Sequence, residues 1–279
     1  MTFVTRFAPS PTGYLHRGHA YSALTAFYAA RAAGGRFLLR IEDIDATRCR
    51  PEYEAAILED LVWLGLSWEE PVRRQSEHLD DYHAAVEALR ECGLAYRCFK
   101  TRKEIDIGRA PHAPQVPYVG ARLPPDEEAA RLARGEAFAW RLSLAAAREA
   151  LGGFEGLTFV EEGAGPHGEA GVIQARPETA GDIVLARKDV GVAYHLAVVH
   201  DDALQGVTHV IRGQDLFEAA HIQRLLQALL GLPTPTYRHH GLLTGPDGKR
   251  YAKRDKAQTL RELRAAGVTP EALRAELGF

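Results

Sequence analysis

The stretch Arg6-Phe-Ala-Pro-Ser-Pro-Thr-Gly13, followed by His16-Arg-Gly-His19, joins a short apolar run to a segment with helical periodicity. Residues 3–8 are rich in β-forming side chains, residues 9–13 are typical of a turn, and apolar residues recur helically over 20–32. This order predicts a strand, a loop and a helix. Such a junction is suited to bind phosphate, because the first N–H groups of a helix lack partners.

The alternation of strands and helices continues beyond this stretch. Gly34-Gly35 ends the first helix, and residues 36–41 and 95–99 predict two more strands, with helices expected over 51–64 and 78–92. An α/β pattern of this kind predicts a Rossmann-type parallel sheet, which binds its ligands at the carboxyl ends of its strands.

The regular pattern breaks at residue 100 and resumes at residue 182. Prolines and glycines interrupt the part between, where one helix is expected over 126–134. Strands are then expected over 183–187, 192–199 and 207–211, and helices over 216–230, 260–266 and 270–277. We therefore expect four parts: a first half of a catalytic domain (1–99), an inserted α+β subdomain (100–181), a second half (182–245), and a basic loop with a short helical segment (246–279).

Composition limits the classes of function. The 279 residues are 46% hydrophobic and 25% charged, which is typical of a globular protein with one large or two modest domains. A net charge of −3 argues against a protein coated in positive potential, so any RNA contact would use a local cluster such as Lys249–Lys256. No run is apolar enough for a membrane span, and no secretory leader is visible, so a cytoplasmic protein without a membrane partner is expected.

The histidine pair is the first candidate for chemistry. His16 and His19 lie three positions apart at the start of a helix, where both rings can reach a polyphosphate, and Gly18 would let a nucleotide approach the backbone. Taken alone, such a pair is more often structural.

Four segments together resemble one family. His16 to His19 resembles the HIGH signature of class I aminoacyl-tRNA synthetases, and Arg6 to Gly13 resembles the glutamyl and glutaminyl branch of that family. Arg40-Ile-Glu-Asp-Ile-Asp45 looks like the RIEDTD segment of the same branch. Arg250-Tyr-Ala-Lys-Arg254 looks like the KMSKS loop, in which only Lys253 matches and alanine replaces the usual serine. The segments occur in the order of the family and span nearly the whole chain.

The resemblance implies an ATP-dependent ligase that activates L-glutamate, with ATP entering as its Mg²⁺ complex. The residues that it implies to be catalytic are His16, His19 and Lys253. Those implied to bind glutamate are Arg6, Ala8, Ser10, Glu42, Tyr194 and Arg212. Those implied to bind ATP are Pro9, His16, Gly18, His19, Arg250 and Lys253.

Charge explains the implied glutamate contacts. Glu42 follows the second predicted strand, where a carboxylate can hold the α-ammonium group, whereas a solvated acidic turn is the plain alternative. Arg6 and Arg212 offer planar guanidinium groups that match carboxylates, although Arg212 could also form a surface salt bridge. The sequence leaves open which arginine reads the side-chain carboxylate. Lys253 would neutralise charge that develops on pyrophosphate.

A zinc site is not expected. Relatives commonly bind zinc in the insertion through a Cys-x-Cys pair, a tyrosine and a later cysteine, but here only Cys98 and Tyr118 remain. Lys100 and Ala121 stand where thiolates would be expected, and two candidates do not make a tetrahedral site. The three cysteines are expected to be structural thiols.

The C-terminal part bears on the acceptor. The chain ends about 25 residues after the KMSKS-like loop, so the anticodon-reading region of a full glutamyl-tRNA synthetase is expected to be absent. Gly18–Leu24 and Gly181–Lys188 look like the truncated glutamyl-Q tRNA(Asp) synthetases. That group activates glutamate without tRNA and esterifies it to queuosine in the anticodon loop of tRNA(Asp). The resemblance thus implies queuosine-containing tRNA(Asp) as the RNA partner, and we expect a monomer.

Three alternatives remain open at this point. A truncated glutamyl-tRNA synthetase would charge a tRNA 3′ end. A small-molecule nucleotidyltransferase would account for His16 to His19 and the basic loop but not for Arg6, Arg212 and the RIEDID segment. A non-catalytic RNA-binding remnant is disfavoured because the nucleotide-contacting residues are intact.

Overall fold

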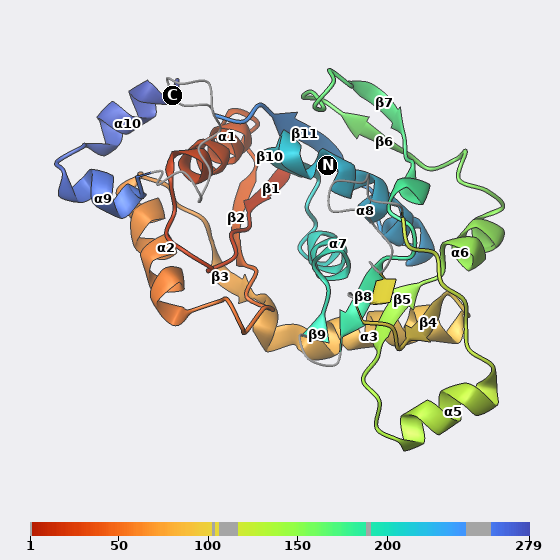
Figure 1. The fold of residues 1–279 in the computed structure, drawn as a ribbon. Coiled ribbons are helices and arrows are strands. Elements are labelled where there is room, and N and C mark those ends of the chain that lie inside the picture. The colour runs from red at the N-terminus through yellow and green to blue at the C-terminus, as the bar shows by residue number, and fades with distance from the viewer. Residues whose placement is uncertain (1, 102–103, 106–116, 188–190, 244–257) are drawn as a thin grey trace.

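The computed structural model describes residues 2–101, 104–105, 117–187, 191–243 and 258–279. The first part of the chain folds as a parallel βαβαβ unit in which β1, β2 and β3 pair in that order (Figure 1). Its elements are β1 (Val4–Phe7), α1 (Arg17–Ala32), β2 (Arg36–Ile41), α2 (Pro51–Trp63) and β3 (Glu69–Arg74). The predicted strand, loop and helix at the start of the chain are confirmed.

A second parallel set of strands continues this arrangement. Strands β10 and β11 pair in parallel, β6 joins β11 in parallel, and β7 pairs with β6 in the antiparallel sense. The backbone N–H of Thr208, just before β10, donates to the carbonyl of Val4 at 2.9 Å, so the amino ends of β1 and β10 lie together. The elements are β6 (Thr158–Glu161), β7 (Gly171–Gln174), β10 (His209–Gly213), α8 (Phe217–Leu229) and β11 (Thr236–His240).

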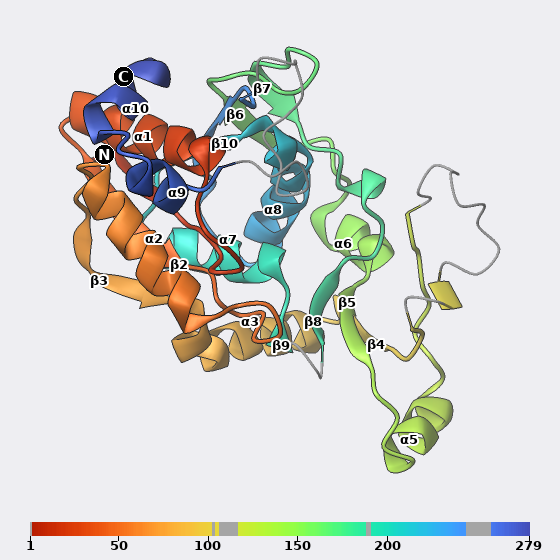
Figure 2. The ribbon, with the colours of Figure 1, turned by 60° about the vertical axis from the view of Figure 1, so that its left-hand side comes forward.

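A separate antiparallel sheet has the order β4-β5-β8-β9. It consists of β4 (Ala95–Cys98), β5 (Ala139–Leu142), β8 (Val184–Arg187) and β9 (Gly191–Val192). The helices nearby in the chain are α3 (Leu79–Glu91), α5 (Pro125–Ala133) and α6 (Leu144–Leu151). Helix α5 projects away from the rest of the molecule in both views (Figures 1 and 2).

The sheet pairing corrects one expectation. Residues 95–98 do form a strand, but it belongs to the antiparallel sheet, and the third parallel strand is β3. The pairing also crosses the expected boundaries: β4 pairs with β5 across residue 99, and β5 with β8 and β6 with β11 pair across residue 181. Strands β6 and β7 of the expected insertion therefore belong to the same sheet as β10 and β11.

The strand expected over 192–199 is wrong. Only Gly191–Val192 is a strand, and Tyr194–Leu204 forms α7. Four consecutive residues of this helix, 196–199, are buried, and the helix lies in the middle of the molecule between the parallel strands and the antiparallel sheet (Figure 1). The helices expected over 216–230, 260–266 and 270–277 are confirmed within a residue or two at each end.

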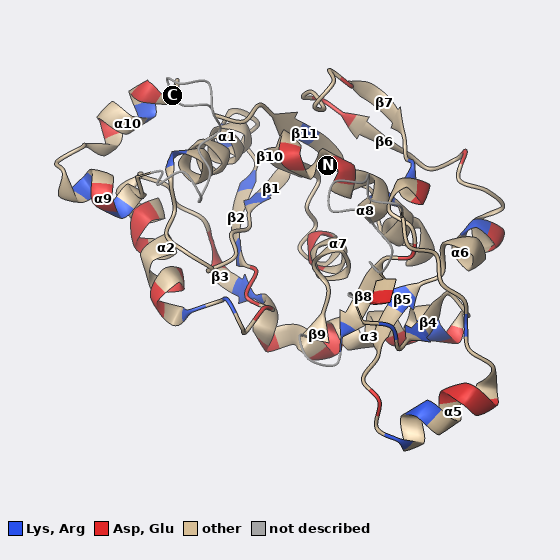
Figure 3. Ribbon diagram, viewed as in Figure 1, with Lys and Arg blue, Asp and Glu red and all other residues tan. Residues whose placement is uncertain are grey.

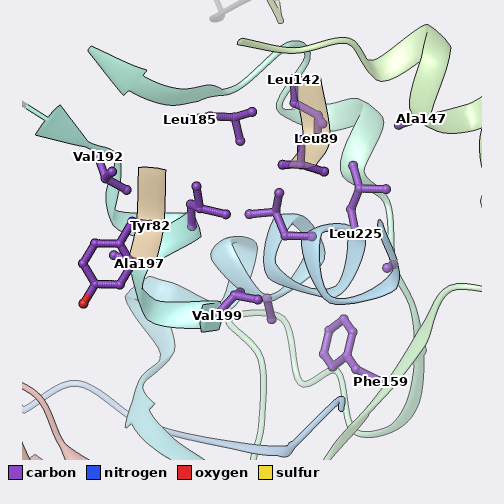
Figure 4. Packing of buried hydrophobic residues seen from close by; sticks show 14 of the residues in the cluster. Tyr82, Leu89, Leu142, Ala147, Phe159, Leu185, Val192, Ala197, Val199 and Leu225 are labelled. Carbon is purple, nitrogen blue, oxygen red and sulfur yellow. The ribbon is translucent and has the colours of Figure 1, made fainter. Parts of the chain in front are cut away.

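One apolar cluster joins the antiparallel sheet to α3, α7 and α8. Figure 4 shows Leu89 of α3, Leu142 of β5, Leu185 of β8 and Leu225 of α8 converging on one another. All four are at most 1% exposed. Because each buried leucine contributes about 1.5–3 kcal/mol, this cluster fixes α7 against α3 and α8.

The last two helices pack beside α1 and α2 (Figure 1). They are α9 (Leu260–Ala265) and α10 (Pro270–Glu276). The N–H of Leu260 donates to the carbonyl of Leu15 at 2.8 Å, and Glu276 accepts from Arg17 Nε at 2.7 Å. Among the described residues, no helix has both the length and the apolar character that crossing a membrane requires.

Candidate active site

A cavity of about 620 Å³ lies at the carboxyl ends of β1, β2 and β10. Every predicted site residue that the structure describes lines it: Arg6, Ala8, Pro9, Ser10, His16, Gly18, His19, Glu42, Tyr194 and Arg212. Residues that are 206 positions apart in the sequence, Arg6 and Arg212, thus face one space. Arg250 and Lys253 lie outside the described residues.

The two histidines are held by the start of α1. His16 is the N-cap residue, and its Nδ1 accepts from the N–H of Gly18 at 3.1 Å. The Nδ1 of His19 accepts from the N–H of His16 at 3.1 Å, and the two ring centroids lie 3.8 Å apart. Because each Nδ1 is an acceptor, a neutral ring carries its proton on Nε2, which is the donor that a phosphate oxygen requires.

The structure favours glycine at position 18 for a second reason, besides the approach of a nucleotide. A Cβ at this position would lie 3.0 Å from Cε1 of His16, so the missing side chain makes room for the capping ring. The preceding loop is tied to β2, since the N–H of Glu42 donates to the carbonyl of Pro9 at 3.1 Å. The loop, the histidines and Glu42 therefore form one connected wall.

Arg6 belongs to a buried charge network. Its Nε donates to Oδ1 of Asp202 at 3.0 Å, and Arg40 donates to the same oxygen at 2.8 Å. All three side chains are at most 6% exposed. Figure 3 shows basic positions on β1 and β2 and acidic positions on α7. Asp202 thus fixes Arg6 in the cavity wall and offsets its charge.

Glu42 is buried rather than part of a solvated acidic turn. It is 7% exposed, and its Oε1 accepts from Arg40 NH2 at 3.1 Å. Burial raises the pKa of Glu42, while the charges of Arg40 and Arg6 oppose that shift. A cationic group in the cavity would offset the desolvation of this carboxylate.

Arg212 lies near the end of β10 and lines the cavity. Its Nε donates to Nε2 of His239 at 3.0 Å and its NH2 donates to the carbonyl of Leu216 at 3.0 Å. The side chain is 5% exposed, and its NH1 has no hydrogen-bond partner within the described ranges. The alternative of a surface salt bridge is wrong, because the residue is buried and the groups that accept its hydrogen bonds are an imidazole and a carbonyl.

Tyr194 also contributes to the cavity wall. It begins α7 and lines the cavity together with Glu42 and Arg212. Burial raises the pKa of Tyr194, so its hydroxyl is a neutral donor at pH 7.

Sequence reasoning missed several lining residues. They are Phe7, Thr12, Tyr21, Ser22, Ile211, Gly213, Asp215, Leu216, His240, Gly241, Leu242 and Leu243. Tyr21 and His240 contact each other edge to face, with ring centroids 5.0 Å apart. Some of the missed residues neighbour the predicted residues in the sequence. His240 ends β11 and residues 241–243 follow it, and the sequence pattern did not predict that strand.

A second cavity of about 420 Å³ adjoins the first. The two share Ser10, Thr12, Glu42 and Tyr194, and the second is also lined by residues of β8 and by the segment after β2. Polar and charged side chains, among them Asp45, Arg48 and Arg187, contribute to its lining. The candidate site is therefore two adjoining cavities with a shared wall at Glu42.

The two remaining candidates for zinc lie together. Cys98 Sγ and the Tyr118 hydroxyl are 3.5 Å apart. The described part of the chain contains no group of three or more His, Cys, Asp or Glu that could hold a metal ion.

We expect the purified protein to contain no stoichiometric zinc, because Lys100 and Ala121 cannot supply the thiolates of a tetrahedral site. Elemental analysis of the protein, purified without chelator and dialysed against metal-free buffer, checks this. About one zinc per chain would contradict it and would point to other ligands.

The sequence of this chain is similar to a known family of proteins. Residues 2–148 and 167–278 match the family model described as tRNA synthetases class I (E and Q), catalytic domain. A glutamyl-Q tRNA(Asp) synthetase of Rhodobacter capsulatus is 48% identical, and the match covers 99% of this chain and 100% of that protein. A glutamate–tRNA ligase 2 of Dinoroseobacter shibae is 42% identical over 96% of this chain and 59% of its own length.

The fold of this chain is also similar to that of a solved glutamate tRNA ligase. The glutamate tRNA ligase of Elizabethkingia meningosepticum, determined in complex with its amino acid, superposes with a TM-score of 0.83 at 28% identity. The chain is covered completely and spans 61% of that protein. From the family match and the full-length relative we conclude that the chain belongs to the class I tRNA synthetases of the glutamate and glutamine type, and that it is a ligase.

Proposed function

We propose that this enzyme activates L-glutamate with ATP in the absence of tRNA and transfers it to queuosine in the anticodon loop of tRNA(Asp). One observation carries the first step. The buried carboxylate of Glu42 and the buried guanidinium of Arg212, whose NH1 has no partner among the described residues, belong to the lining of one cavity, which His16 and His19 also line. A dicarboxylic amino acid presents an ammonium group and a distal carboxylate, which complement these two charges.

The activation step is an in-line displacement at the α-phosphorus of ATP. An oxygen of the glutamate α-carboxylate forms the new P–O bond, and the bond to pyrophosphate breaks, which leaves glutamyl-adenylate. His16 and His19 would donate to the phosphates, and Lys253 would neutralise the charge on the leaving group. ATP would enter as its Mg²⁺ complex, since Mg²⁺ is commonly bound through phosphates with few protein ligands.

The transfer step requires an acceptor hydroxyl beside the activated carbonyl. A hydroxyl of the cyclopentene diol would attack the carbonyl carbon, lose its proton and displace AMP, forming an ester. The second cavity supports this proposal, because it shares Glu42 and Tyr194 with the first. An acceptor seated there would lie next to the predicted position of the glutamate ammonium group, and therefore next to its α-carbonyl.

Similarity and physical reasoning both favour an anticodon-loop acceptor. The glutamyl-Q tRNA(Asp) synthetase of R. capsulatus matches over its full length, whereas the glutamate–tRNA ligase of D. shibae matches over 59% of its length. Proteins read RNA most readily at loops whose bases can be turned outward. A modified anticodon base delivered to the second cavity would need only a small contact surface, with the basic cluster 249–256 to hold phosphates.

Glutamate-dependent ATP–pyrophosphate exchange, measured without RNA, tests the activation step. We expect robust exchange with L-glutamate and little with L-glutamine or L-aspartate. Exchange that appears only after tRNA is added would instead favour an ordinary glutamyl-tRNA synthetase.

Aminoacylation with labelled glutamate tests the acceptor. We expect native tRNA(Asp) with queuosine to accept glutamate and an unmodified transcript of the same tRNA not to. The label should remain on the anticodon-stem fragment after ribonuclease digestion. Label on the 3′-terminal adenosine, or equal charging of both RNAs, would contradict the proposal and favour the 3′-end-charging alternative.

A further inference from the structure

We propose that Glu161 and His239 are positioning residues, which together fix the tautomer of His239 and so direct the guanidinium of Arg212 toward the substrate carboxylate. The inference rests on the proposed function, in which Arg212 binds glutamate. Neither Glu161 nor His239 lines the cavity. They act through Arg212, as second-layer partners that orient a binding group.

The carboxylate of Glu161 is fully engaged with the chain around His239. Its Oε1 accepts from the N–H of His239 and from the N–H of Gly163, both at 2.8 Å. Its Oε2 lies 2.5 Å from Nδ1 of His239, and Glu161 is 1% exposed. Burial alone would raise the pKa of Glu161, but the hydrogen bonds from His239 outweigh it and lower the pKa, so the group is ionised.

An ionised carboxylate determines which nitrogen of His239 carries the proton. The Oε2 of Glu161 can only accept, so Nδ1 must be the donor, and Nε2 of a neutral ring is left as an acceptor. The Nε–H of Arg212 donates to that Nε2 at 3.0 Å. Glu161, His239 and Arg212 therefore form a directed series of hydrogen bonds.

The surroundings of His239 keep its ring neutral. Burial lowers the pKa of His239, and the charge of Arg212 and the neighbouring His240 act in the same direction, while Glu161 opposes them. The ring is stacked 6.0 Å from Tyr237 and contacts Phe217 edge to face at 5.3 Å. A second proton would place a cation against Arg212 and remove its acceptor, so neutrality is required for the contact.

The series leaves one guanidinium nitrogen without a partner among the described residues. His239 and the carbonyl of Leu216 occupy Nε and NH2 of Arg212, which fixes the plane of the group, and NH1 is buried beside the cavity that Arg212 lines. Strand register creates the alignment, because Arg212 is opposite His239 in β10 and β11, and Tyr237 is opposite Glu161 in β11 and β6.

The backbone around Glu161 is shaped for this contact. A Cβ on Gly163 would lie 2.1 Å from the carbonyl oxygen of His239, so only glycine allows the approach that brings its N–H to Glu161. The N–H of Ala164 also donates to that carbonyl at 3.1 Å.

Replacing Glu161 by glutamine, E161Q, tests the proposal with little change of shape. The amide oxygen can still accept the two backbone N–H groups, but the amide NH2 then faces Nδ1 of His239. The ring would have to accept at Nδ1 and carry its proton on Nε2, where it opposes the N–H of Arg212. We expect the KM for glutamate in the exchange assay to rise about tenfold to hundredfold, with the KM for ATP within about twofold of the wild type.

The matched control is Glu162→Gln, which removes the neighbouring, exposed carboxylate and should leave both KM values unchanged. The ¹⁵N shifts of labelled histidine, with His239 assigned by comparison with His239→Asn, report the tautomer directly. We expect the proton on Nδ1 in the wild type and on Nε2 in E161Q.

Three results separate the outcomes. A wild-type ring protonated on Nε2 would overturn the proposal even if E161Q did not fold. A folded E161Q with unchanged KM for glutamate, or with equal loss for ATP and glutamate, would also overturn it. Absence of glutamate-dependent exchange in the wild type would overturn the proposed function instead, while the tautomer measurement would still decide whether Glu161 fixes His239.

Discussion

Replacing Arg212 by glutamine should lower kcat/KM for glutamate by roughly two to three orders of magnitude and remove most of the discrimination against glutamine. The size follows from truncating one partner of a buried charge pair, because the other charge is then left desolvated without compensation. Arg212 is 5% exposed and its NH1 is buried without a partner among the described residues, so water has little access to the guanidinium.

Exchange assays with glutamate and with glutamine, in parallel on both proteins, measure this effect. Arg238→Gln is the matched control, because Arg238 lies on the adjacent strand β11 but is exposed. Wild-type discrimination in the Arg212 variant would show that another cation reads the side chain. Arg6 would be the next candidate, since it lines the same cavity.

Replacing Lys253 by alanine should reduce glutamyl-adenylate formation by roughly two to three orders of magnitude. This is the scale expected when one charge contact to a developing anion is removed from a preorganised site. The basis is its position in the KMSKS-like segment, which lies outside the described residues.

Pre-steady-state measurement of adenylate formation checks the Lys253 prediction. The matched control is Lys256→Ala, a loss of the same charge three positions along the same segment, which should change the rate at most a few fold. If the rate is unchanged for Lys253→Ala, the segment has been misassigned.

Sequence motifs identify individual side chains, whereas strand pairing does not follow from a local pattern, so the sequence was a poorer guide to the sheet topology. The residues taken from the family resemblance converge on one cavity wherever the structure describes them. Glu161 and His239 had no such signal, since they are 78 positions apart and meet only through the pairing of β6 with β11.

Two errors in the fold have identifiable causes. The stretch 192–199 reads as a strand because Val192, Val198 and Val199 are β-branched and the run is almost continuously apolar. In the structure α7 buries consecutive residues between two layers, so it lacks the one-sided pattern by which a helix is recognised. The sequence pattern did not predict strand β3, because four of the six side chains in Glu-Glu-Pro-Val-Arg-Arg are charged and charged residues are uncommon in strands.

The pairing of β6 with β11 also limits how the chain can be divided or recombined. Residues 100–181 look like a removable module in the linear sequence, yet their β6 supplies the carboxylate beneath His239. A chimera that exchanged this segment with a relative's would replace a support of the substrate pocket along with the outer subdomain. To keep β6 and β11 from the same parent, the second crossover point of such a chimera would lie between β5 and β6.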